Sequence, residues 1–482
     1  MEQNELLDLG HKAVKRALES GADEAEAFVY VQNQISIQFF GGIFASRSGA
    51  LKGLRGTFAR IAEPWIKKKG FPMISSGTKA GVGIRSVVEK AIGFSSVSSI
   101  EEKKALEAAE GATKIAKIRP PDPGWFSFPD AKTPAGEGGQ YDKRILELTP
   151  EVLLESCSDC CADIGDFDRR IVQAIAMTTA TSITIATINT HGVEAFDKGT
   201  AFTGVFEAKA KSGTEEVSSG EEFTLRSYSE DYRSLATATS KRTIESLGQK
   251  PLTEKYKGAV LFENVSWNEL FSVIFPSGCS ALNIQDNRSF YKGKIGKQVA
   301  SQSLSIADDG SLPNGFGTAK FDDEGVPRRR TPLIEKGVLS GLLFDNYTAK
   351  RESLESTGNA SRQWGNAAAY ATQPMIRPSN LVLMPGTDGM DSLLRNMANG
   401  VLVKGSLTGS SHSNVITGDF SVSANNAFKI EKGQIAYPLK PCTVAGNLYD
   451  ALNSVIAIGN DSRAFRTVLC PSLVTDKIVV ST

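Results

Sequence analysis

The stretch FDDEGVPRRRTPLIEKGVLSGLLFDNYTAKRESLESTGNASR, residues 321–362, decides the fold that we expect for this chain. It opens on an acidic turn and continues through a Gly-Val-Pro corner and a basic triplet. A hairpin and a short helical run follow. Composition alone does not predict this order of segments, so the block serves as a fingerprint for one kind of fold.

The whole chain has the composition of a globular protein. It has 482 residues, of which 40% are hydrophobic and 22% charged, and its formal net charge is zero. This length allows two or three ordinary domains, and balanced charge gives no general attraction for nucleic acid. No apolar run approaches the roughly 20 residues that cross a bilayer. The N-terminus lacks a signal-peptide pattern, and six cysteines do not make a disulfide scaffold. We therefore expect a cytoplasmic protein without a transmembrane segment or a nucleic-acid partner.

The first half predicts helices and antiparallel hairpins. An apolar stripe over residues 6–18 predicts a helix that is closed by Gly21. Alternating apolar residues at 28–39 predict a hairpin, and residues 81–97 predict a second hairpin with its turn at residues 89–90.

Local capping signals place three further elements in this half. Ser98 and Glu101 have the spacing of a capping box before a helix, and Pro150 suits the first turn of another helix. Residues 189–192 predict a turn between strands, and residues 232–247 predict a helix.

The second half is rich in glycine and strand patterns, with a helix expected near residues 448–458. A polar, proline-bearing stretch at 249–257 precedes the apolar strand GAVLF. We predict an α+β protein in two parts. Residues 1–250 form N-terminal helices plus antiparallel hairpins, and residues 251–482 form a mostly antiparallel, β-rich domain.

Ordered motifs along the chain support a resemblance to a known family. They are VGIRSVVEKAIGFSS, PPDPGW and NTHGVEAFDKGTAFTG, followed by IGKQVASQSLSIADDG, the fingerprint block, TGDFSVSANNAFKIEKGQIAYP and TVAGNLYDALNSVIAIGND. Together they resemble the TldD/PmbA family of modulator-type metallopeptidases, and specifically its PmbA (TldE) branch. The resemblance implies that two subunits enclose a cavity in which unfolded or extended peptides are cleaved.

The resemblance also implies a zinc site that this chain does not provide. In the metal-bearing branch a helix carries H-E-x-x-x-H, whose imidazoles bind zinc while the glutamate acts as general base. The equivalent region here, LFENVSWNELFSVIFPSGCSA (residues 261–281), has Glu263 and Glu269 but no histidine, and Pro276 interrupts its helix pattern. The three histidines of the chain, His11, His191 and His412, lie far apart in sequence. We therefore assign no catalytic residue and no metal ligand to this chain.

The expected function is that of a non-metal subunit. It would complete the cavity and hold the peptide, while a TldD-like partner subunit supplies zinc, so this chain alone is expected to be inactive. A homodimeric peptide-binding protein without hydrolytic activity is the alternative. A metal-independent hydrolase that uses the acidic turns is a more remote hypothesis.

Two polar turns, at residues 356–359 and 417–421, offer backbone groups to an extended peptide. The candidate substrate-binding residues are Thr357, Asn359, Arg362, His412, Thr417 and Asp419. No base stands at a fixed spacing from either serine of these turns, so a serine nucleophile is unsupported. His412 could also bind metal with Cys442 or Cys470 if the fold brought them together.

Other polar clusters favour structural interpretations. Cys157, Cys160 and Cys161 have the pattern of a metal or redox site, but cysteines on a helix pack like small apolar residues. The acidic pairs at 308–309 and 322–324 could bind a cation or cleave a glycosidic bond. Turn chemistry explains them more simply.

A basic, apolar-striped insertion near residues 51–71 departs from the family pattern. Its apolar residues recur at three and four residues, and six lysines and arginines surround them. A helix packed on its own domain is the simplest interpretation. A partner contact, or a membrane or nucleic-acid surface, is also open.

Overall fold

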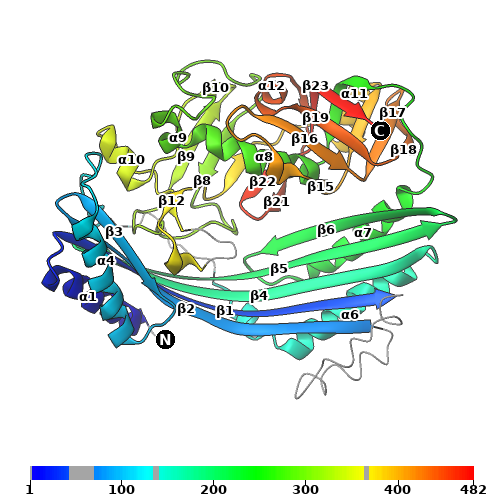
Figure 1. The fold of residues 1–482 in the computed structure, drawn as a ribbon. Coiled ribbons are helices and arrows are strands. Elements are labelled where there is room, and N and C mark those ends of the chain that lie inside the picture. The colour runs from blue at the N-terminus through cyan, green and yellow to red at the C-terminus, as the bar shows by residue number, and fades with distance from the viewer. Residues whose placement is uncertain (1–2, 43–69, 134–140, 363–367) are drawn as a thin grey trace.

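A long curved sheet and a β-rich second part face each other across the molecule (Figure 1). The computed structural model describes residues 3–42, 70–133, 141–362 and 368–482. The insertion expected at 51–71 lies outside the described residues except for its last two positions, which begin a strand.

The first part is one six-stranded antiparallel sheet in the order β3-β2-β1-β4-β5-β6. Its strands are β1 (Glu24–Gly42), β2 (Gly70–Val88), β3 (Ala91–Val97), β4 (Ile171–Asn189), β5 (Glu194–Ser212) and β6 (Glu215–Leu225). The hairpin expected within residues 28–39 is wrong, because β1 runs unbroken between β2 and β4. Its polar middle continues the strand alternation, and Gln32 Nε2 donates to Gln34 Oε1 at 2.9 Å on one face.

Two predicted turns are confirmed. Glu89 and Lys90, at φ 48° and 68°, join β2 to β3 in the left-handed region that a tight hairpin turn requires. Gly192, at φ 81°, closes the turn between β4 and β5. There the Asn189 side-chain oxygen accepts hydrogen bonds from the backbone N–H groups of His191 and Val193.

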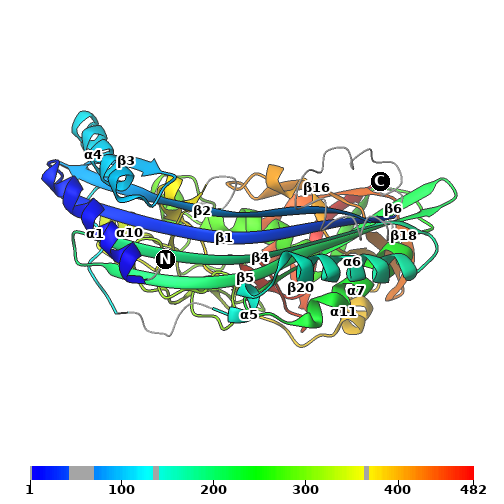
Figure 2. The same ribbon diagram turned by 90° about the horizontal axis from the view of Figure 1, so that it is seen from below.

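Helices cover the outer face of this sheet (Figure 2). They are α1 (Gln3–Glu19) and α4 (Glu102–Ile118) at one end, with α6 (Pro150–Asp166) and α7 (Ser234–Glu245) at the other, and the short α5 (Lys143–Leu146) between. The helix starting at Pro150 is confirmed, with Thr149 Oγ1 accepting from Val152 N. The capping box at Ser98 and Glu101 is wrong: Glu101 makes no side-chain cap, and Ser99 Oγ accepts the Glu101 N–H instead.

The second part begins with β7 (Tyr256–Phe262) and consists of two sheets around a buried helix, α8 (Asn264–Cys279). One sheet contains β8 (Ile306–Asp309), β9 (Arg330–Glu335), β10 (Val338–Leu339), β13 (Leu381–Leu383), β21 (Arg463–Phe465) and β22 (Val468–Cys470). The other contains β7, β14 (Gly400–Val403), β15 (Leu407–Thr408), β16 (Asp419–Ala424), β17 (Ala427–Glu431), β18 (Gln434–Leu439), β19 (Cys442–Asn447), β20 (Val455–Ile458) and β23 (Leu473–Ser481). Only β13–β22 and β7–β14 pair in parallel among these named strands, so the expected α+β class is confirmed.

Short elements complete the second part. They are α9 (Ala281–Gln285), α10 (Asn346–Arg351), α11 (Met390–Met397), α12 (Leu448–Asn453), the pair β11 (Ala360–Ser361) and β12 (Met375–Ile376), and the 3-10 turns η2 (Glu230–Arg233, before α7), η3 (Ala369–Ala371) and η4 (Ser410–His412). The helix expected at 448–458 is half wrong, because it ends at Asn453. Residues 455–458 instead form β20, which hydrogen-bonds to β23. Across the described ranges, no helix is long and apolar enough to cross a membrane.

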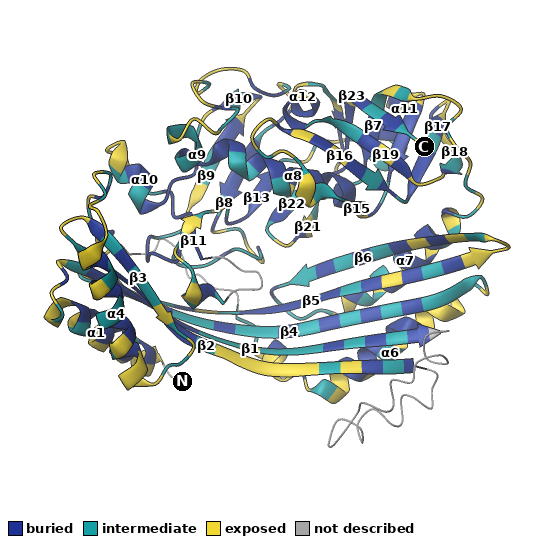
Figure 3. Cartoon of the chain, in the orientation of Figure 1, coloured by how far each residue is buried: buried dark blue, intermediate teal, exposed yellow. Residues whose placement is uncertain are grey.

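Aromatic side chains on α8 form the centre of the second core. Trp267, Phe271 and Phe275 recur every four residues, so they share one face, and all three are fully buried. Figure 3 shows that the strands around α8 are largely buried as well. The rings of Phe271 and Phe275 stack with centroids 4.7 Å apart. The expected interruption at Pro276 is wrong, because α8 continues through the proline to Cys279.

We expect Phe271→Ala to destabilise the protein by about 3–5 kcal/mol, because it leaves a cavity at the centre of this core. The shift of the midpoint in thermal or urea unfolding measures this change in stability. Phe126→Ala is the matched control, since Phe126 is 55% exposed and its loss should cost little. Equal effects for the two variants would contradict the assignment of α8 to the core.

Candidate functional site

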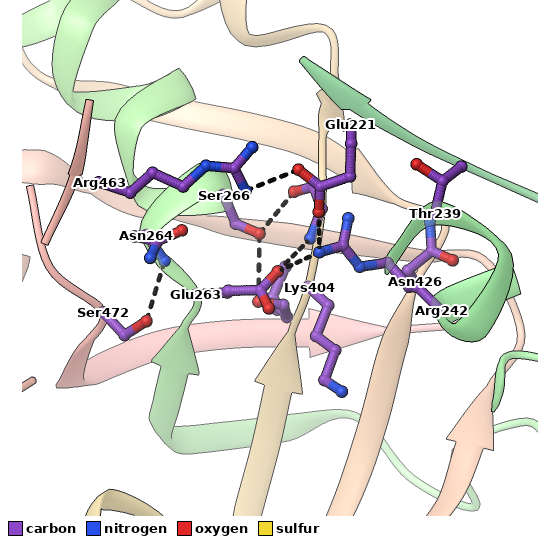
Figure 4. A network of polar contacts seen from close by, with 12 residues as sticks. Glu221, Thr239, Arg242, Glu263, Asn264, Ser266, Lys404, Asn426, Arg463 and Ser472 are labelled. Atoms are coloured by element: carbon purple, nitrogen blue, oxygen red, sulfur yellow. Dashed lines mark hydrogen bonds and ion pairs between the residues drawn. The ribbon is translucent and has the colours of Figure 1, made fainter. Parts of the chain in front are cut away.

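The N-terminus of α8 is tied into a polar network that joins the two parts of the molecule (Figure 4). Glu263 immediately precedes the helix and accepts from Arg242 Nη2 of α7 and from the Gly405 backbone N–H, both at 3.0 Å. Arg242 also pairs with Glu221 of β6. Glu263 therefore holds the two parts together through these two hydrogen bonds.

The same junction is extended by the β21 segment of the second part. Arg463 Nη1 lies 2.7 Å from Glu221 Oε2, so Glu221 is shared by two arginines. Asn426 Nδ2 donates to the Ser218 carbonyl oxygen, and its own oxygen accepts from Ser246 Oγ at 2.8 Å. These contacts fix β6 and α7 against the second part.

A second, fully buried junction lies at the other end of the sheet. Arg85 of β2 forms a two-point contact with Glu26 of β1, at 2.9 and 2.6 Å, and reaches Glu324 Oε1 at 2.8 Å. Arg362 Nη2 donates to Glu26 Oε1 at 2.6 Å and covers the Phe28 ring. We call these four residues, Glu26, Arg85, Glu324 and Arg362, the interdomain charge cluster.

The acidic turn of the fingerprint block supports this cluster. Asp322 Oδ1 accepts from the backbone N–H groups of Glu324 and Val326, and its Oδ2 accepts from Ala360 N at 3.0 Å. Asp323 accepts from the Arg362 N–H. Burial raises the pKa of both aspartates. The turn interpretation of residues 322–324 explains these contacts.

Glu269, the acidic residue on α8, is less constrained by other groups than Glu263 is. It accepts from Ser410 Oγ of η4 at 3.2 Å, and burial raises its pKa. Ser272, one turn further along α8, is exposed. A half-buried carboxyl of this kind can hydrogen-bond a peptide amide or carry a proton.

The residues around α8 do not fit a zinc ion. Within α8 there is no imidazole or thiol except Cys279, which is fully buried and whose pKa is raised by burial. His11 contacts Glu194, His191 contacts Glu24 at 2.9 Å, and His412 lies exposed in η4. Over the described ranges, no three His, Cys, Asp or Glu side chains gather as a metal site would need.

The six predicted substrate-binding residues separate into two groups. Thr357, Asn359 and Arg362 are buried: Thr357 Oγ1 donates to Asn359, and Asn359 Nδ2 donates to Asp308 at 2.6 Å. They do not face solvent in this structure. His412, Thr417 and Asp419 are exposed, and Thr417 Oγ1 donates to Asp419 at 2.6 Å. Substrate contact by this set stays a prediction.

The predicted partners of His412 lie in the core. Cys442 and Cys470 are 2% and 0% exposed, and no metal group with His412 forms among the described side chains. The cysteines of α6 are also buried, where burial raises the pKa of Cys157 to about 11 and that of Cys160 to about 12. Raised thiol pKa values oppose redox or metal chemistry, so packing explains all three.

Sequence analysis missed Glu26 and Arg85. Both lie in apolar strand segments, EAFVYV and VGIRSVV, where alternation should place apolar side chains. A charged residue within such a run signals a buried partner of opposite charge. The sequence does not show that those partners include Glu324 and Arg362, some 240 residues or more away.

Asp308 yields a pH-dependent prediction. It is fully buried on β8, its Oδ1 has no hydrogen-bond partner, and burial raises its pKa from 3.8 to about 6. Because the folded pKa is the higher one, its stabilising contribution is present at low pH and is lost as the pH rises through about 6. We expect Asp308→Asn to exceed the wild type by up to roughly 3 kcal/mol at pH 8 and to match it near pH 4.

Melting temperature measured against pH tests this expectation. Asp309→Asn is the control for loss of a neighbouring carboxyl, because Asp309 is only half buried whereas Asp308 is fully buried. A constant difference between Asp308→Asn and the wild type from pH 4 to 8 would contradict it.

Comparison with known proteins agrees with this architecture. Residues 253–482 match the model of the PmbA/TldA metallopeptidase C-terminal domain. An uncharacterized protein of Methanocaldococcus jannaschii, MJ0231, is 27% identical over 84% of this chain and 90% of its own length. A metalloprotease of Methanothermobacter thermautotrophicus is 37% identical over 175 residues, which is 36% of this chain and 37% of that protein.

Solved structures share the fold over almost the whole chain. The crystal structure of TldE from Thermococcus kodakarensis superposes with a TM-score of 0.84 at 23% identity, over 98% of this chain and 100% of that one. A putative modulator of a DNA gyrase from Thermotoga maritima gives 0.81 at 23% identity, over 98% and 99%. Residues 253–482 therefore belong to the PmbA/TldD metallopeptidase family, and the whole chain shares the fold of these solved structures.

Proposed function

We propose that this chain is a non-metal, TldE-like subunit of a TldD/TldE-type metallopeptidase complex. In this role it binds unfolded or extended peptide between its sheet and its second part, in the cytoplasm, while a TldD-like subunit supplies zinc and the attacking water. The observation that carries the proposal is α8. The family resemblance implies a zinc-binding helix at this place, and α8 offers no imidazole.

The two junctions support the peptide-holding role. The interdomain charge cluster and the Glu221–Arg242–Glu263 network fix the sheet against the second part at both ends. A surface that is already ordered loses less conformational entropy when a peptide binds. Exposed strand backbone and the polar η4 turn then offer hydrogen bonds to an extended chain.

Assay of the purified chain tests the missing metal site. We expect no cleavage of an unfolded protein substrate with or without added zinc, and less than one equivalent of tightly bound zinc by mass spectrometry of metals. Adding a TldD-like subunit from the same host should produce zinc-dependent cleavage.

Other outcomes of that assay discriminate between the hypotheses. Zinc-dependent cleavage by this chain alone would reject the proposal. A stable homodimer that binds peptide but is not activated by any TldD-like subunit would favour the peptide-binding protein without hydrolytic activity.

Breaking the interdomain charge cluster should impair both stability and the activity of the complex. Arg85→Met leaves Glu26 and Glu324 buried without their shared cation, which typically costs about 3–5 kcal/mol. Thermal unfolding and the cleavage rate of the reconstituted complex measure the two effects. Arg288→Met is the control, because Arg288 belongs to an exposed pair with Asp286. Wild-type stability in Arg85→Met would show that the cluster does not hold the parts together.

A further inference from the structure

One buried arginine differs from all the others in the described part of the chain. Four arginines there are less than 9% exposed: Arg85, Arg226, Arg242 and Arg362. Arg85, Arg242 and Arg362 each pair with at least one glutamate. Arg226 has no ion pair, and its Nε has no hydrogen-bond partner. Burying a cation in this way is costly unless something else neutralises it.

The backbone around Arg226 leaves room for its guanidinium. Arg226 follows the last residue of β6 and lies over Gly199 of the neighbouring β5. A Cβ atom at position 199 would come within 2.5 Å of Arg226 Nη2. Gly199 therefore has a packing role, because any larger residue would displace the guanidinium.

One carboxylate and one further cation act on Arg226 without an ion pair or hydrogen bond to its guanidinium in the described part of the chain. Asp197, also on β5, favours the cation electrostatically, but its two oxygens accept from the backbone N–H groups of Lys198 and Lys320, each at 2.8 Å. Arg328 adds a second positive charge, and its own donors go to the Phe321 carbonyl oxygen and to Ser379 Oγ. Burial lowers the pKa of Arg226 to about 10, with Asp197 opposing and Arg328 reinforcing this shift.

A cavity lies further along β5, toward the start of the strand. Ala195 lies two residues before Asp197 and points to the same face of β5, and Phe321 follows Lys320 in sequence. Both residues, together with Gly325, line a cavity of about 290 Å³. Gly199, beneath the guanidinium, lies four residues beyond Ala195, or roughly 13 Å along the extended strand. An extended peptide of about four residues therefore spans the distance from the cavity to the cationic group.

We propose that Arg226, assisted by the positive charge of Arg328, is a binding site for an oxyanion, namely the free C-terminal carboxylate of an extended peptide. The assignment to a peptide rests on the proposed function. A guanidinium presents a planar pair of N–H donors that matches a carboxylate at two points. Such a contact neutralises the buried cation and fixes one end of the peptide. Inorganic phosphate has the same oxyanion chemistry and serves as the probe of the site alone.

Peptide binding to the full-length chain tests the carboxylate. One extended peptide is prepared with a free C-terminus and with a C-terminal amide, and both are titrated by calorimetry. We expect the free acid to bind wild type roughly 10-fold more tightly than the amide, which is typical of a charged hydrogen bond. Arg226→Met should remove this difference, and Arg226→Lys should keep part of it.

The melting temperature without ligand shows whether each variant is folded. Arg226→Met removes an unpaired buried charge, so its melting temperature without ligand should equal or exceed that of wild type. Arg329→Met is the matched control: Arg329 is exposed, donates to the Ser356 carbonyl oxygen, and should leave the discrimination intact. Equal binding of acid and amide to wild type, or unchanged discrimination in Arg226→Met, would overturn the carboxylate site and leave the proposed function standing.

The phosphate probe separates failure of this site from failure of the proposed function. If neither peptide binds, the peptide-holding role is rejected. The melting temperature measured with phosphate then tests the oxyanion site by itself. A rise in melting temperature with phosphate in wild type, but not in Arg226→Met, supports the oxyanion site. No shift in wild type overturns it.

Discussion

The structure depends on buried charges that are shared between the two parts of the molecule. Glu26 and Arg85 come from the sheet, whereas Glu324 and Arg362 come from the second part, and all four are at most 5% exposed. Two arginines share the carboxylate of Glu26, and Arg85 bridges two carboxylates. A buried ion pair adds little stability over a well-packed apolar contact, but an unpaired buried charge is strongly unfavourable. The cluster therefore selects one docked arrangement and penalises partial undocking.

The same logic explains why α8 is a structural helix in this chain. Its aromatic face forms the core between two sheets, and its first turn is held by Glu263 through Arg242 of the other part. One half-buried acid, Glu269, is left toward the η4 turn. A carboxyl without imidazole neighbours cannot hold a zinc ion of the usual kind. The family match of residues 253–482 suggests a metallopeptidase, whereas the side chains of α8 do not fit zinc. The proposed two-subunit role reconciles these two observations.

Local patterns predicted much of the fold, and long-range contacts decided the rest. The Glu89-Lys90 turn, the helix at Pro150 and the turn at Gly192 depend on neighbouring residues, so the sequence predicted them correctly. The hairpin expected in β1 failed because the polar stretch at residues 32–34 interrupts the apolar alternation like a turn, while pairing with two neighbouring strands keeps the segment extended. Residues 455–458 became a strand through pairing with β23, which follows later in the sequence. At the site, the absence of a histidine pair could be seen in the sequence, but the burial of Asn359 and Arg362 depends on Asp308 and Glu26, which only the fold brings close.

The contrast among the buried arginines joins these observations. Where a guanidinium serves only to dock the two parts, as Arg85, Arg242 and Arg362 do, the chain provides a carboxylate for it. At Arg226 the chain provides a glycine beneath the guanidinium, and Asp197 attracts the cation but forms no ion pair with it. Three of these four buried arginines are paired within the chain, and the fourth is not. The unfavourable free energy of an unpaired buried cation is removed when an anionic ligand binds to it. The inner face of the sheet is thus both the docking surface for the second part and the place where an anionic peptide end gains most from burial.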